Sequence, residues 1–170
     1  VYTPGGGTLT FDGPGNWTDA NVVANNFGAV VVVMPASLTA LTATTRVQMN
    51  SLDFQDGTLN VAAGGPLDVN GALTIGDVAA DTFTATLVNS LGGVQVQGAL
   101  LINGTGPGGV FTAGAVANTV TFDGAGTITD NNNQNLGSVV LAGAVTRTSG
   151  SSLRTGAITM NDATLSMGHA

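Results

Sequence analysis

The chain has 170 residues, of which 43% are hydrophobic and only 8% are charged, and its formal net charge at pH 7 is −7. Its three basic residues are all Arg, and so few cations cannot neutralise a phosphate backbone or an anionic lipid surface. We therefore expect no nucleic-acid partner. We also expect no membrane insertion, because no apolar run approaches the roughly 18–20 residues of a membrane-spanning helix.

The predicted elements are short strands, since Lys and Glu are absent while Val and Thr abound. Thr8–Phe11 alternates polar and apolar residues, and Asp12 then begins the turn signal Asp-Gly-Pro-Gly. A longer apolar run covers residues 29–34 and ends at Pro35. Further strands are predicted near residues 46–50, 58–61, 67–69, 72–75, 82–88, 94–96, 99–102, 110–112, 119–122, 138–142, 157–160 and 164–167.

Two internal repeats organise these strands. Residues 8–21 (TLTFDGPGNWTDAN) recur as residues 119–132 (TVTFDGAGTITDNN), with nine of fourteen positions identical and an offset of 111. Residues 68–75 (DVNGALTI) match residues 95–102 (QVQGALLI) at an offset of 27. Repeats of this kind indicate stacked structural units. Because 111 is close to four steps of 27, the longer repeat is predicted to span about four coils.

Short strands at roughly 6–12-residue spacing, without a convincing amphipathic helix, predict an all-β fold. We expect one domain over residues 1–170, a parallel β-helix (β-solenoid) of about six coils, with related copies at about 8–60 and 119–167 and intervening coils at 61–118. An antiparallel β-sandwich, as in filament subunits that exchange strands, is the alternative. The second copy stops where the chain stops, as expected if coils continue in a longer parent protein or if an open end meets another molecule.

Two strings carry a resemblance to a known group of proteins. GTLNVAAGGPLDVNGALTIG and GGVQVQGALLINGTG are similar to the β-strand repeats of secreted bacterial surface proteins, such as autotransporter passengers and filamentous-haemagglutinin-like adhesins. The resemblance implies a parallel β-helix and an extracellular or cell-surface location. It implies no functional residue, because the chain contains no catalytic motif of those families.

Aspartates at turns are the candidates for metal binding. Asp12 and Asp19, with their copies Asp123 and Asp130, share the pattern D-G-x-G-x-x-T-D, and oxygen ligands at turns suit Ca²⁺. The spacing matches neither an EF-hand loop nor the Ca²⁺-binding nonapeptide repeat. The alternative is that these side chains cap their own turns. Calcium is thus the only cofactor that the sequence suggests.

An enzyme is not predicted. Asp53 with Asp56 and Asp77 with Asp81 are close carboxylate pairs of the kind that act on polysaccharides. However, His169 is the only histidine, and few aromatic residues could bind a sugar. Recurring Thr-x-Thr pairs resemble the faces of ice-binding β-helices, although Thr is also a good residue for an outward strand position.

Apolar residues on both sides of a strand indicate self-association, because a strand with one solvent-exposed face should alternate apolar and polar residues. The candidate residues are Val30, Val31, Val32, Val33, Val139, Val140 and Leu141. Low charge also does little to oppose association. We therefore predict an extracellular structural protein that assembles with copies of itself into a surface filament, sheath or layer. The alternative is an adhesin or carbohydrate-binding rod whose partners are surface glycans.

Overall fold

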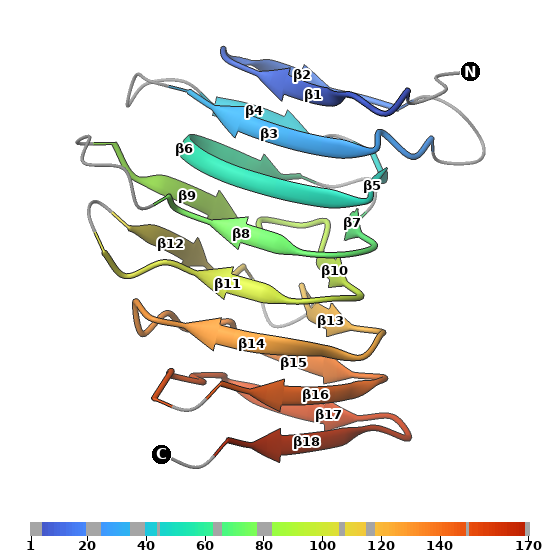
Figure 1. Ribbon diagram of the computed structural model, residues 1–170, viewed down its shortest axis with the longest axis vertical. Helices are drawn as coiled ribbons and strands as arrows, with labels where there is room; N and C mark the ends of the chain where they lie inside the picture. The colour runs from blue at the N-terminus through green and yellow to red at the C-terminus, as the bar shows by residue number, and fades with distance from the viewer. Residues whose placement is uncertain are drawn as a thin grey trace.

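Strands follow one another around the molecule in coils, and each coil returns to the sheet from which it started (Figure 1). A computed structural model describes residues 5–19, 25–34, 40–43, 45–62, 66–77, 83–105, 108–114, 118–148 and 150–168. Every ladder between named strands in these residues is parallel. The predicted parallel β-solenoid of about six coils is therefore confirmed, and the antiparallel sandwich is excluded.

The strands form three faces, which we call sheets A, B and C. Sheet A contains, in spatial order, β1 (Thr8–Phe11), β3 (Ala29–Val33), the first half of β6 (Ser51–Val61), β8 (Leu73–Ile75), β11 (Leu100–Ile102), β14 (Gly126–Asp130), β16 (Ala144–Arg147) and β18 (Thr164–Met167). Sheet B contains β2 (Gly15–Trp17), β4 (Ala40–Ala43), the second half of β6, β9 (Ala85–Val88) and β12 (Gly109–Thr112). Sheet C contains β5 (Val47–Met49), β7 (Leu67–Val69), β10 (Val94–Val96), β13 (Val120–Phe122), β15 (Ser138–Leu141) and β17 (Ala157–Met160).

The core consists of ranks of apolar side chains that run along the solenoid. Successive residues of a strand point to opposite faces, so every second side chain enters the interior. In sheet A the buried Leu52, Leu73, Leu100 and Ile128 lie in register in successive strands. Each coil alone would leave its apolar face open, and stacking buries these faces in one continuous core.

Strand β6 runs from sheet A into sheet B without a break. The corner lies at Gly57, whose φ of 92° belongs to the left-handed region that favours glycine. A Cβ on Gly57 would also lie 2.6 Å from the Cβ of Met34 in the coil above. Glycine is therefore required at this corner for both its backbone conformation and its size.

The 27-residue repeat marks neighbouring coils, as predicted. Asp68 pairs with Gln95 in sheet C, and Ile75 pairs with Ile102 in sheet A. Other coils are shorter, because in-register positions are 21 residues apart between β1 and β3 and 19 apart between β14 and β16. The coil length is therefore not constant along the solenoid.

The 111-residue repeat does not correspond to four coils, so that prediction was wrong. Four steps in sheet A lead from Leu9 only as far as Leu100. Moreover, the first copy begins with β1 in sheet A, whereas the second begins with β13 in sheet C. The shared strand-turn-strand pattern fits both corners, because it requires only an alternating strand and a tight turn.

Among the described residues, sheet B ends at β12, and the coils below it contain strands of sheets A and C (Figure 1). In the coils below it, a short connection with an isolated bridge between Asn135 and Arg154 takes the place of a sheet B strand. The predicted strands do not include β2, β4, β14, β16 or the first half of β6. Alternation in residues 127–129 and 144–147 was the available signal for β14 and β16.

Candidate functional site

The predicted calcium ligands fall into two buried and two exposed aspartates. Asp19 and Asp130 are buried, at 7% and 2% exposure, whereas Asp12 and Asp123 are exposed. Asp19 Oδ2 accepts a hydrogen bond of 2.6 Å from the backbone N–H of Asn25, and Oδ1 accepts one of 3.1 Å from the Asn25 side chain. The Asp19 carboxylate therefore accepts hydrogen bonds from the chain itself, as the capping alternative predicts.

Asp130 holds the start of the connection that takes the place of a sheet B strand in the lower coils. Its Oδ1 accepts from the backbone N–H of Asn132 at 2.9 Å, and its Oδ2 accepts from that of Gln134 at 2.6 Å. Burial raises the pKa of Asp130 above its ordinary value of 3.8. The backbone N–H groups of Asn132, Gln134 and Asn133 and the charge of Arg154 oppose this rise in pKa.

The corner held by Asp130 closes the lower edge of sheet B. Gln134 Oε1 accepts a hydrogen bond of 3.2 Å from the backbone N–H of Phe111, and Asn132 Nδ2 donates one of 2.6 Å to the carbonyl oxygen of Gly109. Both partners belong to β12, so two amide side chains take the place of the next strand. This arrangement blocks an edge that could otherwise pair with another chain.

Within the described part of the chain, no three Asp, Glu, His or Cys side chains lie close enough together to hold a metal ion. Asp53 Oδ2 accepts a hydrogen bond of 2.6 Å from the Gln55 side chain, and Asp56 is buried. Asp81 and His169 lie outside the described residues. The described part of the molecule also contains no helix long and apolar enough to span a membrane.

The predicted self-association residues do not form one surface. Val30, Val32, Val139 and Leu141 are buried in the core with at most 2% exposure, because their strands alternate like the others. Val31, Val33 and Val140 occupy the outward positions, where each is half-buried. The candidates also come from two different sheets, because β3 belongs to sheet A and β15 belongs to sheet C.

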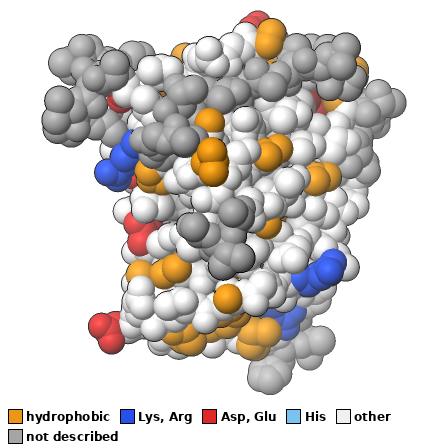
Figure 2. Space-filling view, turned by 180° about the vertical axis from the view of Figure 1, so that it is seen from behind, with side chains coloured by type: hydrophobic (Ala, Val, Ile, Leu, Met, Phe, Trp, Pro, Cys, Tyr) orange, Lys and Arg blue, Asp and Glu red, His pale blue; other side chains and the backbone are white. Residues whose placement is uncertain are grey.

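The last described coil exposes apolar side chains, and two of them lie at positions that are buried in every coil above it. Ile158 and Met160 of β17 are 42% and 50% exposed, although they lie in register with the buried Val139 and Leu141. Met167 of β18 is 51% exposed. Hydrophobic side chains gather along this lower end in the space-filling view (Figure 2). The described residues therefore leave these side chains partly uncovered.

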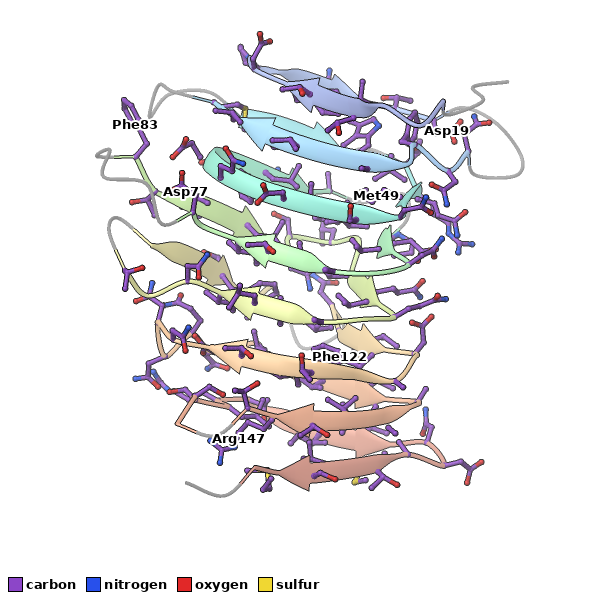
Figure 3. The ribbon with its side chains drawn as sticks, in the orientation of Figure 1. Asp19, Met49, Asp77, Phe83, Phe122 and Arg147 are labelled. Atoms are coloured by element: carbon purple, nitrogen blue, oxygen red, sulfur yellow. The ribbon has the colours of Figure 1, made fainter. Side chains whose placement is uncertain are left out.

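Two strand edges lie beside these exposed side chains. Among the described residues, β17 pairs only with β15, and β18 pairs only with β16. Arg147 lies close to this end in the side-chain view (Figure 3), and its Nη2 donates a hydrogen bond of 3.2 Å to the carbonyl oxygen of Gly168. This bond fixes the end of β18 against β16. Ile158, Met160 and Met167 are not among the predicted self-association residues, although alternation along the predicted strands at 157–160 and 164–167 gives their positions.

The opposite end is closed by aromatic rings. Trp17 is 4% exposed and lies between Phe11 and Phe27, with ring-centroid distances of 4.7 and 5.4 Å. These tilted and edge-on arrangements are favourable for aromatic pairs. Phe11 and Phe27 are only half-buried, so they also offer apolar surface at this end.

Comparison with family models, curated proteins and solved structures finds no match to this chain. The class of the protein, a parallel β-solenoid, therefore follows from its own structure.

Proposed function

We propose that this chain is an extracellular structural protein that assembles with copies of itself into a surface filament, sheath or layer through strand edges and exposed apolar side chains. The observation that carries the proposal is the exposure of Ile158, Met160 and Met167, which are about half exposed beside the edges of β17 and β18 that pair with no other strand among the described residues. The sequence resemblance supports the extracellular location. Lateral contact through the valines has less support, because Val31 lies between Thr10 and Asp53 in its outward rank.

The energetics favour contact at this end. Covering the exposed half of an Ile or Met side chain contributes about 1 kcal/mol, since complete burial is worth roughly 1.5–3 kcal/mol. An unpaired strand edge can also form a ladder of backbone hydrogen bonds with another strand. The described part of the last two coils contains only Arg147, Arg154 and Asp162 as charged residues, so little charge repulsion opposes the contact.

Sedimentation velocity over a range of concentrations, with negative-stain electron microscopy, tests the proposal. The unmodified chain should form species that grow in length with concentration, whereas Met160→Asp should remain monomeric with an unchanged urea midpoint. Leu91→Asp is the matched control, because Leu91 is 62% exposed but lies in the connection after β9, away from the last coil. An unmodified chain that stays monomeric at every concentration would overturn the proposal, as would assembly of Met160→Asp at the same concentration.

A further inference from the structure

The outer face of sheet C carries a set of amide and carboxylate side chains where β5, β7 and β10 lie side by side (Figure 1). Gln48, Asp68 and Gln95 are in register and form one rank across these strands. A second rank begins two residues further along each strand. We call this set the amide face, and its members are Gln48, Asn50, Asp68, Asn70, Gln95 and Gln97.

The amide face points away from the core. Asp68 alternates with the buried Leu67 and Val69, and Gln95 alternates with the buried Val94 and Val96. Neighbouring strands lie about 4.8 Å apart, and alternate residues of one strand are about 6.7 Å apart. The strands therefore hold the polar groups in a regular array on the surface.

Hydrogen bonds within the face hold several of these side chains in place. Asp68 Oδ2 accepts one of 2.5 Å from Arg46 Nη2 and one of 3.3 Å from Gln48 Nε2. Gln48 Nε2 also donates to Asn70 Oδ1 at 3.3 Å. Side chains that are already held lose less conformational entropy when a ligand binds.

Other polar atoms of the face are available to a ligand. Among the described residues, the side chains of Gln95 and Gln97 form no hydrogen bond, and neither does Asn70 Nδ2. Gln97 is exposed, whereas Gln95 and Asn70 are half-buried. Each amide group offers an acceptor oxygen and two N–H donors. The free groups can therefore both donate and accept hydrogen bonds.

The amide face carries no net charge of its own together with its neighbour Arg46. Arg46 forms an ion pair with Asp68, whose side chain is only 4% exposed, and the other members are uncharged. A phosphate or carboxylate ligand would find its only nearby cation in this strand already paired. The charges therefore favour a neutral ligand that forms many hydrogen bonds.

From this arrangement we infer that the amide face binds a neutral carbohydrate chain. Adjacent sugar hydroxyls both donate and accept, so an amide group can donate to one hydroxyl and accept from the next. An extended peptide fits less well, because β7 already pairs with both β5 and β10 and offers no free strand edge. The inference is independent of the proposed self-assembly, since no member of the face lies in β17 or β18.

Calorimetric titration of the full chain tests the inference. The probes are neutral hexasaccharides of glucose, mannose and N-acetylglucosamine, and the anionic hexamer of galacturonate. At least one neutral hexasaccharide should bind, and more tightly than the galacturonate hexamer. Gln95→Ala should weaken that binding about tenfold, because it removes hydrogen bonds to the sugar. Gln95 forms no side-chain hydrogen bond among the described residues, so the urea midpoint should not change.

Gln55→Ala is the matched control, because Gln55 is half-buried on the outer side of β6 and should not affect sugar binding. The exposed Gln97 provides a second variant, Gln97→Ala, should Gln95→Ala lower the urea midpoint. Absence of binding by all three neutral hexasaccharides would overturn the inference. So would tighter binding of the galacturonate hexamer, or an equal affinity in the amide-face variants and the unmodified chain. A loss of affinity in Gln55→Ala as large as that in the amide-face variants would also overturn it.

Discussion

Gly98 stacks directly on Gly71 at the corner between sheets C and A, and a Cβ on Gly98 would lie 2.7 Å from the carbonyl oxygen of Gly71. The backbone N–H of Gly98 donates a hydrogen bond of 3.1 Å to the same oxygen. Gly126 in turn lies against the carbonyl group of Gly98. This corner therefore depends on the absence of side chains in successive coils.

Gly98→Ala should destabilise the solenoid. The added methyl group meets backbone atoms that cannot rotate away, and overpacking of this kind costs about 1–3 kcal/mol. Urea unfolding monitored by circular dichroism measures the change. Gly13→Ala is the control, because nothing lies within 4 Å of a Cβ at Gly13. Equal free energies of unfolding for the two variants would contradict the packing argument.

Neighbouring valines of β3 should respond differently to truncation. Val32 is fully buried, so Val32→Ala removes two methyl groups from the core and should lower the free energy of unfolding by about 2 kcal/mol. Val31 lies on the outer face and is half-buried, so Val31→Ala should cost less than about 1 kcal/mol. Thermal and urea unfolding of both variants measure the difference. If Val31→Ala were the more damaging change, the orientation of β3 would be wrong.

Removing the Gln134 side chain should open the lower edge of sheet B. The Phe111 backbone N–H donates to Gln134 Oε1, so Gln134→Ala leaves this N–H without its acceptor. Loss of about 1–2 kcal/mol of local stability should accelerate exchange of the Phe111 amide hydrogen by about 5–30-fold. Hydrogen exchange measured by NMR tests this. The Leu87 amide, in the neighbouring strand β9, is the internal control and should exchange at an unchanged rate.

Asp130 should make stability depend on pH. Burial raises the pKa of its carboxyl group in the folded state above 3.8, so the folded chain holds this proton more tightly than the unfolded chain. The associated stability is fully present below the unfolded-state pKa and is lost as the pH rises through the folded-state pKa. The sign follows because deprotonation is easier in the unfolded chain.

Urea unfolding at several pH values from 3 upward should show this loss in comparison with Asp130→Asn. The free energy of unfolding of the natural chain, minus that of Asp130→Asn, should fall as the pH rises above about 3.8, because Asn cannot titrate. Asp123→Asn, at an exposed corner, controls for the change in net charge. A difference that rises with pH would show that the hydrogen bonds from Asn132 and Gln134 outweigh the burial of the carboxyl group.

The fold class could be predicted from local information. The alternation of short strands and the turn residues can be read from the sequence. Like residues at an offset of 27 do lie side by side, as for Ile75 and Ile102. The capping alternative for Asp19 and Asp130 was likewise available from residue type, since an aspartate at a turn can accept backbone hydrogen bonds.

The candidate site could not be predicted in the same way. In a run such as residues 30–33 every side chain is apolar, so composition cannot say which valines face inward; closure of the coil places Val30 and Val32 in the core. Sequence alone also treats Met160 and Met49 as similar apolar residues of short strands. Stacking separates them, because Met49 is fully buried, whereas Met160 is 50% exposed and β17 pairs only with β15 among the described residues.

Local pattern is thus enough to predict β coils with apolar inner ranks, because alternation and turn chemistry act within a few residues. The length of each coil, the end of sheet B and the exposure of Ile158, Met160 and Met167 follow from stacking instead. These features depend on which coils lie above and below a strand, and backbone pairing between coils is a long-range contact that local pattern does not specify.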